Sequence, residues 1–132
     1  IYDRVEELDP LGVVIDEVQF YIDSAPGLIE VVRQFAEEGR IVILAGLNTD
    51  FRGEPFGPMP ILMALADQVN SLFAICSECG AEATFTQRLI DGQPAPFDSQ
   101  LVVIGAEGTY AARCRKCHEV PGKKGFADIV DT

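Results

Sequence analysis

Two Cys-x-x-Cys pairs constrain the fold of this chain more than any other feature. Cys76 and Cys79 form the first pair, Cys114 and Cys117 form the second, and the sequence contains no other cysteine. A Cys-x-x-Cys step folds into a tight turn that directs two thiolates at one point, and two such turns complete the tetrahedron that Zn²⁺ prefers. The pattern predicts a structural zinc site. The stretch between the pairs, residues 80–113, is longer than in a compact zinc ribbon, so we expect it to project as a loop.

Composition narrows the class of protein and its compartment. The 132 residues include 10 basic and 21 acidic side chains, for a formal net charge of −11. This charge disfavours nucleic-acid binding through a broad electrostatic face, although a local site for a small phosphorylated ligand stays open. No apolar run is long enough to span a membrane, and the first residues do not resemble a signal peptide. Disulfides are the alternative for the cysteines, but the metal-like spacing favours reduced, zinc-bound thiols in a cytoplasmic protein.

The first part of the chain predicts a parallel strand–helix–strand unit. Residues 11–15 and 41–44 are apolar runs rich in β-branched side chains, which is typical of buried parallel strands. Residues 24–38 predict a helix with Ser24 as its cap and Pro26 in its first turn. Two strands joined by one helix form a right-handed parallel unit of an α/β sheet.

Shorter elements are expected on either side of this unit. The patterns predict helices over residues 1–8 and 61–66, and strands over residues 69–75, 84–89 and 101–104. The last two strands belong to a β-rich module that follows Cys79. The tail after Gly122 is expected to be loosely ordered.

Two acidic residues, Asp16 and Glu17, directly follow the first apolar strand. In nucleotide-dependent phosphotransferases an acid at such a place helps to hold Mg²⁺, and a second carboxylate can deprotonate the attacking hydroxyl. Two solvated acids at a strand end are the alternative. From the dipeptide alone, that alternative is the more frequent one.

The irregular stretch over residues 45–60 follows the second strand, where α/β sheets bind ligands. Phe51 and Phe56 can sandwich a planar ring, and Arg52 can address a charged group. The alternative is that both rings anchor the loop to the core. His118, beside a cluster already filled by four cysteines, is expected to be a bystander to the metal.

Together these motifs resemble the thymidine kinase family of the cytoplasmic, zinc-containing type, especially its bacterial members. The resemblance runs in order from Val13 to Gly122. It rests on residues 15–20, 45–47, 50–57, 76–79, 86–89, 104–110 and 114–118. Each motif is weak alone, but their shared order is specific. Val18 and Asn48 depart from residues that are frequent in the family, without touching the expected chemistry.

The resemblance implies a role for each matching residue. Asp16 corresponds to the acid near Mg²⁺ and the phosphates, and Glu17 to the general base for the deoxyribose 5′-hydroxyl. The nucleotide-binding residues would be Asp16, Glu17, Val18 and Gln19. The nucleoside contacts would be Phe20, Leu47, Phe51, Phe56, Thr86, Leu101, Val103, Gly105 and Tyr110. The four cysteines would hold the zinc that anchors both ends of residues 86–110, the family's lasso, which closes over the thymine and reads it largely through backbone groups.

The resemblance also implies the fold and the partners. The expected fold is α/β: part of a P-loop (RecA-like) parallel sheet with helices over residues 1–75, a small β-rich zinc-ribbon and lasso domain over residues 76–122, and a flexible tail over residues 123–132. The implied reaction transfers the ATP γ-phosphoryl group to thymidine with Mg²⁺, for DNA precursor salvage, in a cytoplasmic homotetramer. Thymidine triphosphate is a candidate feedback inhibitor. Neither nucleic acid nor a membrane is an expected partner.

One family element is missing from the sequence. No Gly-x-x-x-x-Gly-Lys-Ser/Thr motif or other glycine-rich phosphate cradle occurs in it. We therefore expect these residues to be the carboxy-terminal two-thirds or so of a thymidine kinase, inactive as this polypeptide alone. The alternatives are a non-enzymatic zinc-ribbon binding module and a truncated relative that binds nucleoside or a partner without catalysis.

Overall fold

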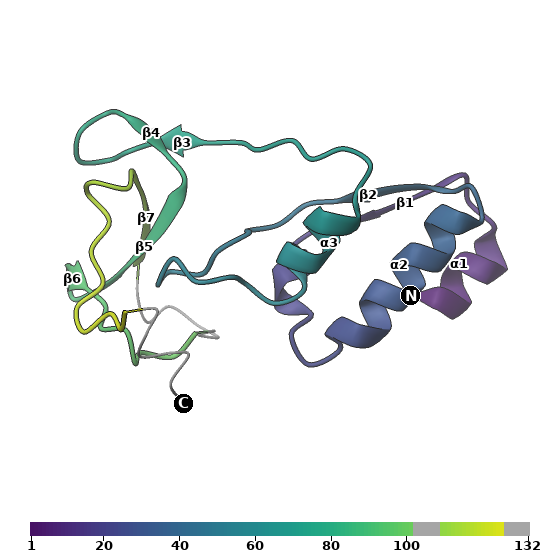
Figure 1. Ribbon diagram of the computed structural model, residues 1–132, viewed down its shortest axis with the longest axis horizontal. Helices are drawn as coiled ribbons and strands as arrows, with labels where there is room; N and C mark the ends of the chain where they lie inside the picture. Colours follow the sequence, from purple (N-terminus) through teal and green to yellow (C-terminus); the bar gives the residue numbers. More distant parts are fainter. Residues whose placement is uncertain (102–108, 126–132) are drawn as a thin grey trace. The chain divides into compact units, whose positions relative to one another are not determined.

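The computed structural model describes residues 1–101 and 109–125, and the chain divides into two compact units (Figure 1). The first unit comprises Ile1–Asn48 and Pro55–Val69. The second comprises Thr49–Glu54 and the chain from Asn70 onward. This division lies slightly before the boundary expected at residue 75, and it assigns the loop 49–54 to the second unit. Within the described ranges, no helix is both long and apolar enough to cross a membrane.

The first unit is built on a two-stranded parallel sheet. Strand β1 (Gly12–Ile15) pairs in parallel with β2 (Ile41–Leu44), and α2 (Ala25–Glu37) connects them. This confirms the predicted strand–helix–strand unit. Helices α1 (Tyr2–Leu8) and α3 (Met59–Leu65) confirm the two short helices that the pattern predicted.

The core of this unit lies between the inward face of the sheet and the helices. Leu28, Val32 and Phe35 on α2 are buried at the spacing of one helix face. Leu28 and Val32 join a cluster that includes Ile15 from β1 and Leu62 from α3. The apolar stripe read from the sequence therefore does face the core.

The prediction that both strands are buried is wrong. Alternate side chains point away from the core, and Val14 is 69% exposed while its cross-strand partner Ile43 is 55% exposed. Successive side chains of a strand point to opposite faces, so helices that cover one face leave the other open. Ser24 does occupy the N-cap of α2, but its side chain makes no capping hydrogen bond.

Phe35→Ala is expected to lower the free energy of unfolding of the first unit by about 3 to 5 kcal/mol. The Phe35 ring is fully buried and lies parallel to the Tyr2 ring of α1, with 5.9 Å between the ring centroids. Urea denaturation followed by hydrogen exchange of α2 measures the effect. Leu11→Ala is the control because Leu11 is 91% exposed. Equal effects of the two substitutions would contradict the packing described.

The second unit is a small β-structure. Strands β3 (Ala74–Ile75) and β4 (Glu82–Ala83) pair antiparallel, and β6 (Gln93–Pro94), β5 (Phe85–Ile90) and β7 (Thr109–Arg113) form a second antiparallel sheet in that order. Strand β5 confirms the strand predicted over residues 84–89. The strand predicted over residues 69–75 is confined to its last two residues, which are the ones that pair with β4. The strand predicted over residues 101–104 lies outside the described residues beyond Leu101.

Candidate functional site

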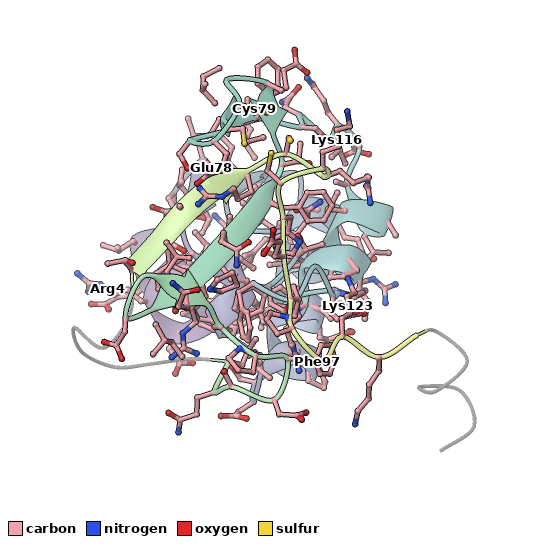
Figure 2. All side chains as sticks on the ribbon, turned by 90° about the vertical axis from the view of Figure 1, so that its left-hand side faces the viewer. Arg4, Glu78, Cys79, Phe97, Lys116 and Lys123 are labelled. Atoms are coloured by element: carbon pink, nitrogen blue, oxygen red, sulfur yellow. The ribbon has the colours of Figure 1, made fainter. Side chains whose placement is uncertain are left out.

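The two cysteine turns of the second unit meet in one cluster. The four Sγ atoms all lie within 4.8 Å of one another, and those of Cys79 and Cys114 are 3.6 Å apart. Figure 2 shows sulfur atoms gathered beside Cys79. A tetrahedral zinc ion with Zn–S bonds of about 2.3 Å requires sulfur atoms about 3.8 Å apart. The donor set and its spacing fit Zn²⁺, as the sequence predicted.

Backbone hydrogen bonds shape each of the two cysteine turns. In the first turn, Gly80 donates its N–H to the Cys76 carbonyl at 2.9 Å. Gly80 has φ +75°, a conformation that costs glycine little and other residues more. In the second turn, the N–H groups of Cys117 and His118 both donate to the Cys114 carbonyl, at 3.1 and 3.0 Å. The local sequence therefore preorganises two ligands in each turn.

Arg113 ties the two turns to each other. Its guanidinium donates to Glu78 at 2.7 Å and also to the Ser77 hydroxyl, and only 7% of the residue is exposed. Ser77 in turn donates its N–H to the Ala112 carbonyl at 3.1 Å. The residues between Cys76 and Cys79 are thus held against the end of β7, next to Cys114.

Hydrogen bonds shift the pKa values of the metal-free thiols in opposite directions. A hydrogen bond from the backbone of Cys114 lowers the pKa of Cys76 to about 6. Hydrogen bonding of the Cys117 thiol to Cys114 raises the pKa of Cys117 to about 12. Zinc binds cysteine as the thiolate, so the Cys117 proton has to leave when the metal binds.

Zinc binding near pH 7 is accordingly expected to release protons and to weaken as the pH falls. The released protons are measured by calorimetry in buffers with different ionisation enthalpies, where the apparent heat of zinc binding should change from buffer to buffer. A heat that does not depend on the buffer would mean that all four sulfurs are already thiolates.

The acidic pair lies in the first unit, after β1. Asp16 and Glu17 are both exposed, and Asp16 Oδ1 accepts the Glu17 N–H at 2.9 Å. Glu17 has φ +53° and stands at the start of the short helix η1 (Val18–Phe20). This turn leaves the Glu17 carboxylate accessible while its backbone is bent out of the strand direction.

Gln19 connects the Glu17 carboxylate to the loop after β2. Its Nε2 donates to Glu17 Oε2, and its Oε1 accepts the Leu47 N–H at 3.0 Å. Gln19 and Val18 are both fully buried. The side chains of Gln19 and Val18, expected at a nucleotide-binding position, therefore lie inside the unit, where the amide of Gln19 orients Glu17.

Two glycines leave room for this buried amide. A Cβ atom on Gly46 would overlap Gln19 Oε1, and one on Gly57 would overlap the Gln19 carbonyl oxygen. Gly57 also has φ +52°, which disfavours other residues. Sequence reasoning missed this arrangement. The only local signal for this arrangement was a glycine near each end of the irregular stretch over residues 45–60.

The expected aromatic contacts divide between exposed and buried positions. In the first unit, Phe20 and Leu47 are 53% and 43% exposed, whereas Phe56 is buried and meets the Phe20 ring edge-on, with 5.7 Å between the centroids. In the second unit Phe51 is also buried. Phe51 and Phe56 therefore anchor their loops, and Phe20 offers an open aromatic face.

The loop 49–54 is closed around a buried carboxylate. Asp50 is 2% exposed and accepts the backbone N–H groups of Arg52 and Glu54 at 2.8 and 3.2 Å. The Arg52 guanidinium donates to the same side chain at 2.8 Å. Four donors around one carboxylate give this loop a single defined shape.

Asp50→Asn is expected to lower the free energy of unfolding by about 1 to 3 kcal/mol, because a neutral amide replaces a carboxylate that accepts only from N–H donors. Urea denaturation of the second unit measures this. Asp98→Asn, at an exposed position, should change stability by less than about 0.5 kcal/mol. Equal stability of the Asp50 and Asp98 variants would show that solvent replaces the buried contacts.

The register of β5 and β7 separates two faces of the second unit's sheet. Thr86 pairs with Ala112 and Arg88 with Tyr110, so these side chains share one face. Thr86 is half-buried and Tyr110 is 54% exposed. Leu101 is also half-buried. The remaining expected contacts, Val103 and Gly105, lie outside the described residues.

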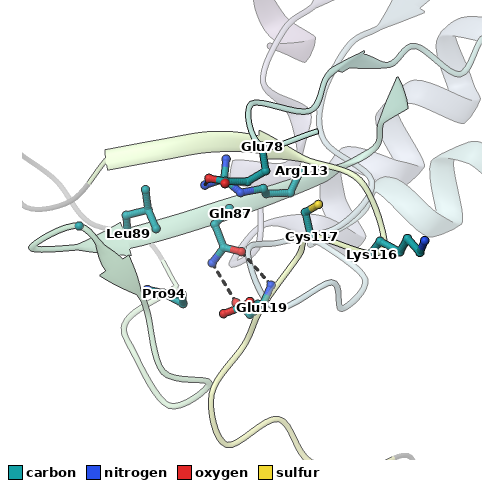
Figure 3. Close-up of a pocket in the computed structure, with 9 residues that line it drawn as sticks. Glu78, Gln87, Leu89, Pro94, Arg113, Lys116, Cys117 and Glu119 are labelled. Carbon is teal, nitrogen blue, oxygen red and sulfur yellow. Dashed lines mark hydrogen bonds and ion pairs between the residues drawn. The ribbon is translucent and has the colours of Figure 1, made fainter. Parts of the chain in front are cut away.

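The opposite face holds a cavity of about 480 Å³ (Figure 3). Gln87, Leu89 and Arg113 line it, and Cys117 is the one lining residue that was expected in a site. Gln87 donates to the Glu119 carbonyl and accepts the Glu119 N–H, both at 2.8 Å. These two hydrogen bonds hold the chain that follows the second cysteine turn against β5.

The fold and the site define a class of protein: an α/β unit with an acidic strand end, followed by a β-rich module whose cysteine cluster is compatible with a zinc ribbon. The chain matches the family described as "Thymidine kinase" over residues 1–118. Since the match covers most of the chain, the chain belongs to the thymidine kinase family. Membership implies a kinase, a phosphotransferase, and suggests thymidine and ATP as its substrates.

Proposed function

We propose that this chain is the nucleoside-binding and catalytic-base portion of an ATP-dependent thymidine kinase. The observation that carries the proposal is the exposed Glu17 carboxylate, held by buried Gln19 beside the exposed ring of Phe20, in a chain of this family. The reaction transfers the γ-phosphoryl group of ATP to the 5′-hydroxyl of thymidine. The enzyme serves DNA precursor salvage as a cytoplasmic homotetramer, with thymidine triphosphate as a feedback inhibitor.

Glu17 accepts the proton of the 5′-hydroxyl as that oxygen attacks. Asp16 and Glu17 lie where a Mg²⁺ ion would be held, and that ion supplies charge stabilisation for the phosphates. Positioning contributes more than proton abstraction to phosphoryl transfer. The hydrogen bond from Gln19 supports this assignment, because it limits the orientations that the Glu17 carboxylate adopts.

The residues proposed to contact the nucleoside are described for each unit separately. In the first unit they are the exposed side chains of Phe20 and Leu47, and the buried Phe56 packs edge-on against the Phe20 ring. In the second unit they are the lasso residues, among them Thr86, Leu101, Val103, Gly105 and Tyr110, while the buried Phe51 anchors the loop 49–54. A base that is read through backbone groups needs a rigid loop, and zinc at both ends of residues 86–110 supplies that rigidity.

Calorimetric titration of the zinc-loaded 132-residue chain with thymidine tests the proposal. We expect saturable binding that Phe20→Ala weakens about tenfold, because an exposed aromatic contact of this size contributes roughly 1.4 kcal/mol. We also expect no turnover with ATP and Mg²⁺, since the sequence has no phosphate-cradling motif. Absence of saturable binding would favour a non-enzymatic zinc-ribbon module, and steady turnover would refute the expectation that this chain alone is inactive.

A further inference from the structure

The loop that carries Phe51 is attached to the second cysteine turn. His118 Nε2 lies 2.8 Å from the Phe51 carbonyl oxygen. A carbonyl oxygen can only accept, so Nε2 carries the hydrogen of this bond. His118 immediately follows Cys117 and is not one of the four clustered ligands, but its ring joins the second cysteine turn to a residue far away in the sequence.

The His118 ring is fixed from several directions. Its backbone N–H donates to the Cys114 carbonyl within the cysteine turn, at 3.0 Å. Its ring stacks on Phe85 of β5, with 4.8 Å between centroids and 24° between planes. The Arg115 guanidinium lies 4.7 Å from the centroid of the same Phe85 ring. The orientation of His118 therefore depends on the folded turn and on β5.

Further contacts hold the same loop. Lys123 Nζ donates to the Arg52 carbonyl at 2.9 Å and lies 3.8 Å from the Glu54 carboxylate. The Arg88 guanidinium lies 5.6 Å from the centroid of the Phe51 ring. Lys123, which Figure 2 labels, and residues 49–54 belong to the same compact unit. The loop 49–54 is therefore part of the second unit, which contains the four-cysteine cluster.

We propose that His118 is a positioning residue that couples the zinc turn to the Phe51 loop, so that metal binding fixes where Phe51 is held. Only the last link, the use of the loop 49–54 in nucleoside binding, rests on the proposed function. The coupling itself follows from the hydrogen bond to the Phe51 carbonyl and from the fixed ring of His118. Zinc binding then fixes the loop 49–54 as well as the two ends of the lasso.

Hydrogen exchange of the zinc-loaded 132-residue chain tests the coupling. His118→Ala is expected to raise exchange of the amides in residues 50–54 about tenfold, the equivalent of one lost hydrogen bond. His118→Gln keeps a side-chain N–H donor and should restore much of the protection. Lys116→Ala, an exposed position in the same turn, should leave exchange unchanged. Unchanged exchange in His118→Ala at full zinc content would overturn the proposal.

A second pair of variants covers the case in which His118→Ala fails to fold. Lys123→Ala should loosen residues 50–54 at full zinc content, and Lys124→Ala, its exposed neighbour, should not. Equal exchange in these two variants would show that the module does not hold the loop. Thymidine titration of the same proteins is a separate readout. If the unmodified chain does not bind thymidine, the proposed function fails, while the exchange data still decide the coupling.

Discussion

Removal of zinc is expected to unfold the second unit while helix α2 stays protected. Among the residues that the structure describes, the buried cluster at the four cysteines comprises Cys76, Ala83 and Cys114, and strands β3 and β4 pair over two residues each. So small an apolar core cannot offset the conformational entropy of the lasso, and the metal supplies the difference. A chelator titration followed by hydrogen exchange measures both units in one sample.

Cys114→Ser tests the same expectation without a chelator. Cys114 is buried, and its carbonyl accepts two N–H groups of the second turn. The variant removes one sulfur ligand, and the backbone carbonyl that accepts these two hydrogen bonds is still present. We expect substoichiometric zinc and loss of protection in β5 and β7. Lys116→Ala is the matched control and should keep about one zinc per chain. A folded, zinc-free protein with two disulfides would refute the metal site.

Glu17→Gln is expected to lower kcat by about 10²- to 10⁴-fold in a thymidine kinase that contains this chain. A glutamine has the same size and can still accept the Gln19 hydrogen bond, so the geometry of the turn is kept. What is lost is the group that takes the hydroxyl proton. Steady-state kinetics with saturating ATP and Mg²⁺ measure kcat and KM separately, and KM for thymidine should change little.

Glu82→Gln is a suitable control because Glu82 is an exposed carboxylate in β4. It should retain the kcat of the unmodified enzyme. A loss of less than about tenfold in Glu17→Gln would show that Glu17 is not the general base, and positioning by other groups would then account for the rate.

Local patterns predicted the elements of the first unit well and their exposure poorly. The apolar runs became β1 and β2, and the spacing of Leu28, Val32 and Phe35 gave the correct helix face. An apolar run specifies a strand but does not say how many of its faces are covered. The exposure of Val14 and Ile43 depends on what packs against the sheet, which is a tertiary property.

In the site, too, the sequence predicted the local features but not how the side chains pack. The spacing of the cysteines was sufficient to predict the cluster. The acids after the first strand are exposed, which fits both a catalytic pair and two solvated acids at a strand end. The sequence predicted that Phe51 and Phe56 could sandwich a planar ring. In the structure both side chains are buried. A sequence pattern places an aromatic residue in a loop, but the packing around that loop decides whether its ring faces solvent.

The sequence by itself determined that this chain has a parallel α/β unit, a four-cysteine cluster and an acidic strand end, because each depends on residue types at short, regular spacings. Only the tertiary structure decided what positions these groups. Gln19 bonds to Leu47 across 28 positions, and His118 bonds to Phe51 across 67. Contacts between such distant residues leave no local periodicity, since they arise from the folded path of the chain.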